Sequence, residues 1–417
     1  MPGAPGTHTV MIMALAAVVI GCGVDAPEPV ITTVSDSAGV RLVQHDLSGV
    51  ELPAWRTLAM HDLQVGGNGG TGDTAFSSIE DITVAPDGRI LVSDRDAAEV
   101  RVYSASGIWE RTLGVAGDET VNFESPPAFA GLARDTLYAF DPSQGSVTPV
   151  HLDGGGGEPL SLIAIGIDRP GVVLRRSDGS YVVQSPWVVA GPAGAYGPRL
   201  EQDSVVITTA AQDGSRVDSL TVLPDMYWGR SVESIPDGRV RVRQANPPYS
   251  PRAFLLTDGV LTTVAHSSEF DFSVHDERGR VVDRIRVTGV RHPATRHDIR
   301  QEQEARLRAD LGDDIPESAR RLFVDFAPEQ LPAFADARYS EAGDLWVALQ
   351  DLGETEGTDW VVLSSDGTLR GSVHTPGTLT PRYISDEYLV GVVVDAVEGP
   401  MVRRYALISP PGEPDQP

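Results

Sequence analysis

The segment from Phe76 to Gly114 most constrains the fold, because apolar and polar residues alternate there in four short runs. Such alternation places one side of a run against a core and the other toward solvent, as in a half-buried β-strand. The runs are separated by Asp-Gly and Ser-Gly turns, which are typical of tight hairpins. The segment therefore predicts a unit of four antiparallel strands.

The same two kinds of turn recur along the chain and alternate strictly. One kind precedes an alternating strand, and the other joins the last two strands of a unit. A four-stranded unit that repeats about every 40–50 residues is typical of the blades of a β-propeller. Five pairs of turns predict five blades: Gly88 with Gly107, Asp135 with Gly145, Gly179 with Gly214, Gly238 with Gly279, and Gly343 with Gly367.

A sixth blade is expected to come from the two ends of the chain. Strand-like runs lie at Gly39–Val43 and Trp55–Leu58 near the N-terminus, and at Tyr388–Val394 and Val402–Ile408 near the C-terminus. Pairing strands from both ends in one blade would close the ring and remove two free sheet edges. The predicted fold class is all-β, a six-bladed β-propeller of four-stranded antiparallel blades. Rings of five or seven blades are the alternatives.

One segment, about residues 294–335, interrupts the repeat before the last blade. Its first part, Thr295–Leu311, is rich in good helix formers and spaces its apolar residues at helical intervals. Glutamates precede arginines by four positions, as in Glu302 with Arg306, which supports an exposed helix. The segment predicts a mostly polar helical insertion that lies across one face or rim of the ring.

The N-terminus has the features of an export signal. The run from Val10 to Gly21 is uninterrupted and apolar, but shorter than the roughly 20 residues of a membrane-spanning helix. It ends at Cys22, the single cysteine, so no disulfide forms within the chain. We expect a signal peptide over 1–21, a lipidated tether over 22–34, the propeller over 35–410 and a disordered tail over 411–417.

The residues Val19-Ile20-Gly21-Cys22 resemble the lipobox of bacterial lipoproteins, in which the cysteine is lipidated and becomes the mature N-terminus. The resemblance implies lipid attachment at Cys22. Because Gly23 rather than aspartate follows, it also implies export to the outer membrane, on its periplasmic side or at the cell surface. An ordinary export signal with an incidental cysteine is the alternative.

The charge of the chain argues against nucleic acid as a partner. Asp and Glu number 59, whereas Lys and Arg number 33, and every one of these basic residues is arginine. With a formal net charge of −26, no basic stripe is present to neutralise phosphates or to bind an anionic membrane surface. We therefore expect membrane contact through the lipid anchor only.

Several segments resemble the six-bladed β-propeller lipoproteins of Gram-negative bacteria, which are related to NHL-type and TolB-like propellers. The opening blade is similar to an NHL repeat, and the chain departs from the group at the loop 114–123. The resemblance implies the fold and an envelope location, whereas the group has no common assigned activity. The segments that carry it are Ser35–Val40 with Trp55, APDGRILVSD (85–94) with VRVYSASG (100–107), the insertion with its Pro-rich end (326–334), and Asp344–Val347 with Trp360 and Asp366-Gly367.

Motifs for catalysis are weak in this sequence. No G-x-S-x-G nucleophile elbow occurs, and the glycine-rich stretch Gly66–Gly72 does not lead into a helix with a lysine, so it predicts a loop. His292 and His297 could ligate a metal. Their spacing of five, with Pro293 between them, does not fit a pair on one helix face, and exposed residues at a helix entry explain them better.

Three aspartates, Asp94, Asp141 and Asp351, follow comparable strands. We expect Asp94 to accept backbone N–H bonds from the following turn. Propellers with calcium-dependent lactonase activity need carboxylate and amide ligands that converge in the central channel, and no accompanying Glu and Asn set is recognisable here. We therefore predict no catalytic residue, no metal ligand and no cofactor.

Aromatic residues and arginine gather in the long insertions between the predicted strands. Such residues are favoured at binding surfaces, although a tryptophan at a blade edge also fills gaps between sheets. The candidate ligand-face residues are Trp187, Tyr227, Trp228, Arg230 and Tyr249.

These features favour a lipid-anchored, monomeric envelope protein that is not an enzyme. It would act as a binding or scaffold module for a peptide, a glycan or a partner protein across one propeller face. The alternative is a metal-dependent hydrolase or lyase with its site in the central channel.

Overall fold

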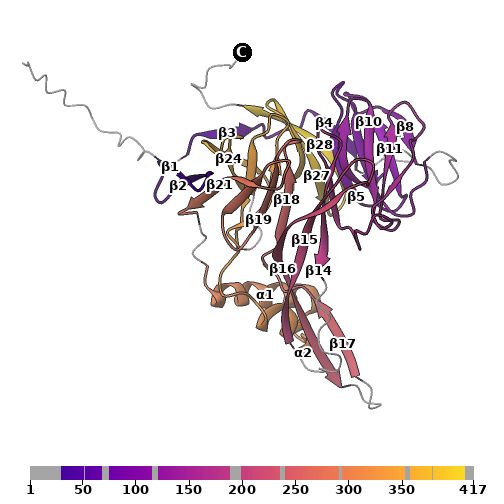
Figure 1. Cartoon of the computed structure of the whole chain (residues 1–417). Coiled ribbons are helices and arrows are strands. Elements are labelled where there is room, and N and C mark those ends of the chain that lie inside the picture. The colour runs from indigo at the N-terminus through magenta and orange to yellow at the C-terminus, as the bar shows by residue number, and fades with distance from the viewer. Residues whose placement is uncertain are drawn as a thin grey trace, which may run out of the picture.

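The computed structural model describes residues 30–50, 52–67, 75–114, 121–187, 199–234, 240–290, 294–352, 357–377 and 379–408. Most of this part of the chain lies in β-strands, which form five hydrogen-bonded sheets (Figure 1). The prediction of an all-β chain is confirmed.

Three of the sheets contain strands from one continuous stretch of chain each. The first sheet holds β5 (Ile79–Val84), β6 (Ile90–Asp94), β7 (Glu99–Tyr103) and β8 (Trp109–Leu113). The second holds β9 (Ala128–Ala133), β10 (Thr136–Asp141), β11 (Ser146–His151) and β12 (Leu160–Ser161). The third holds β13 (Val172–Arg175), β14 (Tyr181–Trp187), β15 (Arg199–Ala210), β16 (Val217–Ser234) and β17 (Val240–Ala245).

The other two sheets recruit strands from the N-terminal segment. The fourth sheet holds β1 (Ile31–Ser37), β2 (Val40–Asp46), β18 (Ala253–Thr257), β19 (Thr262–His266), β20 (Asp271–His275) and β21 (Val281–Thr288). The fifth, of nine strands, holds β3 (Ala54–Thr57), β4 (Leu63–Gly66), β22 (Phe334–Tyr339), β23 (Leu345–Leu349), β24 (Gly357–Leu363), β25 (Leu369–Pro376), β26 (Leu379–Ile384), β27 (Tyr388–Asp395) and β28 (Gly399–Ile408).

The segment Phe76–Gly114 folds as predicted, into the antiparallel sheet β5–β8. Gly88 and Gly107 adopt φ values of 87° and 79°, which glycine reaches without steric cost, so both turns depend on them. The Asp87 carboxylate accepts the backbone N–H of Arg89 at 3.1 Å, as an Asp in a tight turn commonly does. Of the other predicted turns, the one at Gly238 lies outside the described residues.

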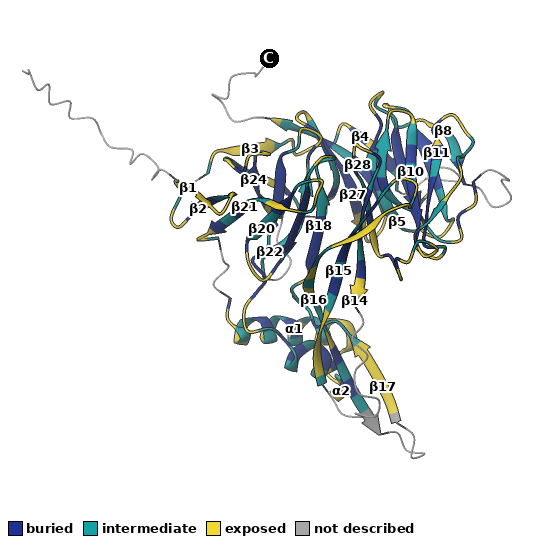
Figure 2. Ribbon diagram, in the orientation of Figure 1, coloured by how far each residue is buried: buried dark blue, intermediate teal, exposed yellow. Residues whose placement is uncertain are grey.

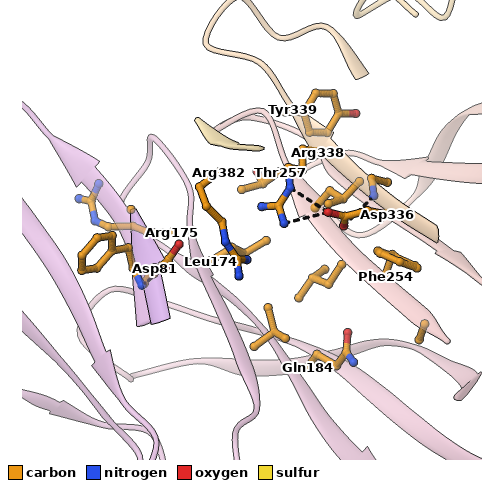
Figure 3. Close-up of a pocket in the computed structure, with 18 of the residues that line it drawn as sticks. Asp81, Leu174, Arg175, Gln184, Phe254, Thr257, Asp336, Arg338, Tyr339 and Arg382 are labelled. Carbon is orange, nitrogen blue, oxygen red and sulfur yellow. Dashed lines mark hydrogen bonds and ion pairs between the residues drawn. The ribbon is translucent and has the colours of Figure 1, made fainter. Parts of the chain in front are cut away.

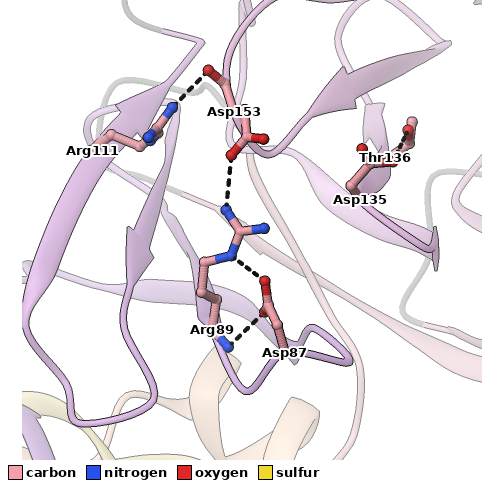
Figure 4. Close-up of polar contacts among 6 residues, drawn as sticks. All are labelled: Asp87, Arg89, Arg111, Asp135, Thr136 and Asp153. Carbon is pink, nitrogen blue, oxygen red and sulfur yellow. Dashed lines mark hydrogen bonds and ion pairs between the residues drawn. The ribbon is translucent and has the colours of Figure 1, made fainter.

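Polar contacts join this sheet to the next one (Figure 4). The Arg89 guanidinium pairs with Asp87 at 2.7 Å and reaches Asp153, after β11, at 3.3 Å. Arg111 on β8 donates to the backbone carbonyl of Asp153 at 2.6 Å. A hairpin turn of one sheet therefore also positions the loop of its neighbour.

Six inner strands from the five sheets stand side by side in a ring. Strands β26, β5, β9, β13, β18 and β22 contact one another in this order. The ring is closed between β22 and β26 by the N–H of Glu341, which donates to the carbonyl of Ile384 at 2.8 Å. Sheets that radiate from a ring of inner strands form a β-propeller, which is the fold of this chain.

Apolar cores lie between neighbouring groups of strands, and Figure 2 shows the buried strands in dark blue; a smaller cluster lies within the helical insertion. Between β18–β21 and β22–β25, four phenylalanines pack together: Phe254, Phe270, Phe272 and Phe334. Neighbouring sheets cover both faces of β6, which explains why all five of its residues are buried, including Ser93 and Asp94.

The two ends of the chain meet, as predicted. Strand β4 pairs with β28, with Val65 opposite Val402, and β3 lies between β28 and β25. The sequence predicts a strand at Trp55–Leu58 but not at Leu63–Gly66, which forms the longer of the two pairings with β28. This run of four residues was too short to show an alternating pattern.

The first predicted N-terminal run does not join the C-terminal strands. It forms β2, which pairs in parallel with β21. Arg41 forms an ion pair with Asp283 at 2.8 Å, and the buried ring of His45 hydrogen-bonds the carbonyl of Gly367 at 2.7 Å. These contacts hold β2 beside β21, and β1 is the outer edge strand of the fourth sheet.

The helical insertion lies where it was predicted, between β21 and β22. It contains α1 (Arg296–Leu311), α2 (Glu317–Arg320) and the π-helical turn η2 (Arg321–Asp325). A capping box of Thr295 and Asp298 begins α1, and Glu302 pairs with Arg306 at 2.6 Å as expected. Two antiparallel groups of strands follow the insertion: β22–β25, which contains the predicted turns at Gly343 and Gly367, and β26–β28, which contains the predicted C-terminal strands.

The insertion packs against β16 below the ring (Figure 1). The absent side chain of Gly229 leaves room for Phe326 and Leu322, to which a Cβ would come within 2.7 and 3.0 Å. Strands β15 and β16 extend past the ring to meet these helices, and β17 adds to their outer end. Among the described residues, no helix has both the length and the apolar character to cross a membrane.

Candidate functional site

A cavity of about 680 Å³ lies at the centre of the ring. Its walls come from the inner strands β5, β9, β13, β18, β22 and β26, with contributions from β14 and β16 (Figure 3). This volume lies within the range of about 300–1,000 Å³ that small-molecule sites occupy. The charged residues in its walls are Asp81, Arg175, Asp225, Arg252, Asp336, Arg338 and Arg382.

β-bulges set the direction of the charged side chains. The pairing register shifts by one residue just before Asp81 in β5, just before Asp336 in β22, and at Arg382 in β26. A bulge turns a side chain away from the regular alternation of the strand. Three inner strands with otherwise buried apolar residues thus present charges to the cavity.

Asp336 is the centre of an ion-pair network. Its Oδ2 accepts from Nε and Nη2 of Arg338, at 2.9 and 2.8 Å. Its Oδ1 accepts the backbone N–H of Ala337 at 2.9 Å and lies 3.9 Å from Nη2 of Arg252. Arg252 also stacks on Phe254, with 4.6 Å from its Cζ to the ring centroid. Both oxygens of Asp336 are therefore occupied.

Asp81 is held by backbone groups of two strands. Its Oδ1 accepts the N–H of Ile82 and its Oδ2 the N–H of Phe129 on β9, both at 2.9 Å. Burial raises the pKa of Asp81, although these hydrogen bonds and the nearby Arg382 oppose the shift. The carboxylate thus ties two inner strands together at the cavity wall.

The surroundings of Arg382 disfavour the charged form of its side chain. Burial, and then repulsion from Arg338, lower its pKa, although Asp81 and Asp336 act in the opposite direction. Its Nε is buried and has no hydrogen-bond partner within the described part of the chain. Figure 3 shows its side chain between Asp81 on one side and the Asp336–Arg338 pair on the other.

The remaining polar groups line the edge of the cavity. Arg175 lies over the ring of Tyr138, with 4.0 Å from its Cζ to the centroid, and its guanidinium points away from Arg382 (Figure 3). The Tyr339 hydroxyl is hydrogen-bonded to Thr263 Oγ1 at 2.7 Å. Burial raises the pKa of Tyr339 to about 12, so this hydroxyl stays protonated at neutral pH.

This arrangement suits the binding of an anionic group better than metal chemistry. Among the residues that the structure describes, no group of three or more His, Cys, Asp or Glu side chains is placed to hold a metal ion. The carboxylates of Asp81 and Asp336 already accept the hydrogen bonds described above. Four arginines and three aspartates in the walls leave one positive charge in excess.

The predicted turn-capping role of Asp94 is confirmed. Its carboxylate accepts the N–H groups of Asp96 and Ala97 at 3.1 and 3.3 Å. Asp141 caps its own turn in the same way, accepting from Ser143 and Gln144 at 2.9 and 3.3 Å. Neither aspartate lines the central cavity.

The candidate ligand-face residues lie away from the central cavity. Tyr227, Trp228 and Arg230 are on the part of β16 near the helical insertion, and Tyr249 packs beside Ile299 of α1. The N–H of Tyr227 donates to Ser250 Oγ at 2.7 Å, so the structure brings Tyr227 close to Tyr249. The side chain of Trp228 is 41% exposed.

The two other predicted sites cannot be placed. The backbone of Trp187 ends β14, but its side chain lies outside the described residues, as does all of Cys22. Their assigned roles stay predictions.

None of the seven charged cavity residues was predicted from the sequence, and four of them, Asp81, Asp336, Arg338 and Arg382, lie on the inner strands β5, β22 and β26. One signal was present, because each interrupts an apolar first strand of its repeat with a charge, as in FADARY and LTPRYI. The bulges that aim these side chains inward depend on pairing with the next strand and leave no local pattern.

Comparisons with known proteins give no family assignment. No protein-family model matches the chain, and no curated protein does. Among solved structures, it is similar to a member of the DUF4221 family from Bacteroides vulgatus, with 6% identity, a TM-score of 0.47, and coverage of 85% of this chain and 98% of that one.

Two further structural neighbours have names that mention an activity or a ligand. Virginiamycin B lyase from Staphylococcus aureus shows 10% identity and a TM-score of 0.37, over 83% of this chain and 98% of that one. Regucalcin from Agrobacterium tumefaciens, described as calcium-binding, shows 12% identity and a TM-score of 0.39, over 87% and 98%. At these scores the likeness carries no functional argument, and the fold assignment rests on the strand pairing and the ring described above.

Proposed function

We propose that this chain is a lipid-anchored envelope propeller that acts as a non-catalytic binding module, with the central cavity as its binding site. The ligand is a peptide, a glycan or a group on a partner protein. The proposal includes six blades, since the nine-stranded sheet divides into β22–β25 and into β26–β28 with β4, joined by β3. The similarity of the opening blade to NHL repeats supports the same count.

The observation that carries the proposal is that the Asp81 and Asp336 carboxylates of the cavity already have hydrogen-bond and ion-pair partners within the chain. Metal-dependent hydrolases and lyases need carboxylates that converge on a cation. Here Asp336 is bound by Arg338, and Asp81 is bound by two backbone N–H groups. Guanidinium groups and apolar walls such as Ile82, Leu174 and Phe254 remain for a ligand. Such a site binds without supplying a metal-activated nucleophile.

Metal analysis of the purified full-length chain tests this function. We expect far less than one equivalent of Ca²⁺ or Zn²⁺ per chain after gel filtration. Treatment with a chelator should leave the thermal unfolding midpoint unchanged, because no described contact depends on a cation. A retained metal ion at a ratio near one, together with a midpoint that falls on chelation, would contradict the binding function and favour the metal-dependent hydrolase or lyase.

The lipid anchor is tested through Cys22. We expect Cys22→Ser to abolish labelling by a clickable fatty-acid analogue and to move the protein from the membrane fraction to the soluble fraction, because the hydroxyl is a far weaker acceptor than the thiol for the lipid transfer. Gly23→Ser is the matched control and should label like the natural chain. Labelling that persists in Cys22→Ser would remove the lipoprotein assignment while leaving the fold unaffected.

A further inference from the structure

We propose that Arg382 is the anion-binding residue of the central cavity, and that the part of the ligand that enters the cavity carries a carboxylate or a phosphate. This inference rests on the binding function proposed above and names the chemistry of its ligand. Three observations support it: the position of the Arg382 side chain, the contacts that the nearby charged residues already form, and the size and lining of the cavity.

The position of Arg382 is fixed by the backbone. In β26, Pro381 pairs with Gly391 and Tyr383 pairs with Val390, so Arg382 is the extra residue of a bulge. The residues on either side hold their places in the sheet, and the bulge directs the guanidinium into the cavity (Figure 3). A side chain placed this way is preorganised, because its direction does not have to be selected on binding.

The nearby acids are already engaged. Asp336 forms its ion pair with Arg338, and Asp81 accepts backbone N–H groups through both oxygens. Both act on Arg382 through the electrostatic field only, while Arg338 repels it. The Arg382 side chain is half-buried, and its buried Nε lacks the hydrogen bond that normally compensates for removal from water.

The other cavity arginines have fixed partners. Arg338 binds Asp336, Arg252 stacks on Phe254 and donates to the Ala335 carbonyl at 3.2 Å, and Arg175 stacks on Tyr138. A ligand anion would therefore meet Arg382 first, with Arg338 near enough to add a second attraction. A planar guanidinium matches the paired oxygens of a carboxylate or phosphate, which gives short, directional hydrogen bonds.

The walls add a preference for an organic anion over an inorganic one. Ile82, Leu174 and Phe254 supply apolar surface, and Gln184 and Thr257 supply neutral polar groups. At about 680 Å³ the cavity is much larger than a bare anion. A group with a charged end and a compact apolar body fits this composition.

The test uses three probes that share one ring, namely benzoate, phenyl phosphate and the uncharged benzamide, on the full chain. We expect a saturable rise in the thermal unfolding midpoint with benzoate or phenyl phosphate and none with benzamide. The stronger of the two anions identifies carboxylate or phosphate as the preferred group. If neither anion binds the natural chain, the proposal is wrong.

Variants of Arg382 locate the binding. We expect Arg382→Gln to lower the affinity for the preferred anion at least tenfold, and Arg382→Lys to lower it less, because lysine keeps the charge but loses the planar fork. Arg308→Gln is the matched control, since Arg308 is on the outer helix α1 and pairs with Glu304 at 2.9 Å. Unchanged affinity in Arg382→Gln would place the anion elsewhere and overturn the proposal.

Stability without ligand gives a second, independent readout. Because Arg382 is half-buried and its buried Nε has no hydrogen-bond partner, its replacement by glutamine should leave the unfolding midpoint unchanged or raise it. A lower midpoint, or failure to fold, would show that Arg382 is a structural residue and would overturn the proposal. Neither result bears on the binding function itself, which a stoichiometric metal ion would contradict instead.

Discussion

A chain that ends at Glu398 is expected to lose its folded structure, because it lacks β28. This strand pairs with β27 over eight residues, from Tyr388 with Ala406 to Asp395 with Gly399, and it also pairs with β3 and β4. Its side chains of Met401, Val402 and Tyr405 are almost fully buried. Burial of three such residues contributes about 5–9 kcal/mol, which is comparable with the whole stability of a typical domain.

Circular dichroism and limited proteolysis would measure this loss. The matched control ends at Ile408, so that it keeps β28 complete and removes only residues 409–417. We expect the control to unfold cooperatively at the midpoint of the full chain, and the shorter chain to show no cooperative transition. A shorter chain with an unchanged midpoint would show that the ring does not need closure by its two ends.

The second large effect is expected for Phe334→Ala. The Phe334 side chain is 1% exposed, and its ring centroid lies 5.0 Å from that of Phe254 and 5.2 Å from that of Phe272. Removing a buried phenylalanine costs about 3–5 kcal/mol through lost burial and the cavity left behind. The loss is large because Phe334 joins the cores of two neighbouring sheets.

Urea denaturation provides the measurement for this variant. We expect a lower midpoint with an unchanged slope, since the surface exposed on unfolding stays similar. Ile108→Ala is the control, because Ile108 is 67% exposed and should change the stability by less than about 0.5 kcal/mol. Equal midpoints for the two variants would mean that the phenylalanine cluster does not hold the sheets together.

The sequence predicted the features that depend on neighbouring residues. Gly88 and Gly107 mark their turns because only glycine readily adopts the positive φ angle that each turn needs. The start of α1 was predictable within one residue, because Thr295 and Asp298 form a local capping box. Asp94 was assigned correctly since a carboxylate at a turn finds backbone N–H groups two and three residues later.

The central cavity was not predictable by the same reasoning. Asp81 and Arg382 are about three hundred residues apart, and they share a cavity because β26 and β5 are neighbours in the ring. The bulge at Arg382 depends on pairing with β27, so its inward direction is a property of the sheet and not of the residues around it. Aromatic residues in loops, such as Trp228, carry a signal in the sequence, but Trp228 lies on β16 outside the cavity walls.

The pairing of β2 with β21 also could not be predicted from residues that are close in the sequence. A parallel pair between residues that are more than two hundred positions apart has no turn to mark it. The alternation at Gly39–Val43 predicted a strand, and a strand forms there, but its partner was chosen by Arg41 with Asp283 and by the burial of His45.

The pairing of β4 with β28 also limits how early in folding this part of the sheet can form. Val65 cannot pair with Val402 until the chain between these two residues has been made. Contacts between such distant residues slow folding, because a long loop must close before they stabilise anything. Sheets made from one continuous stretch of chain, such as β5–β8, are therefore expected to form before the sheet that joins β4 to β28.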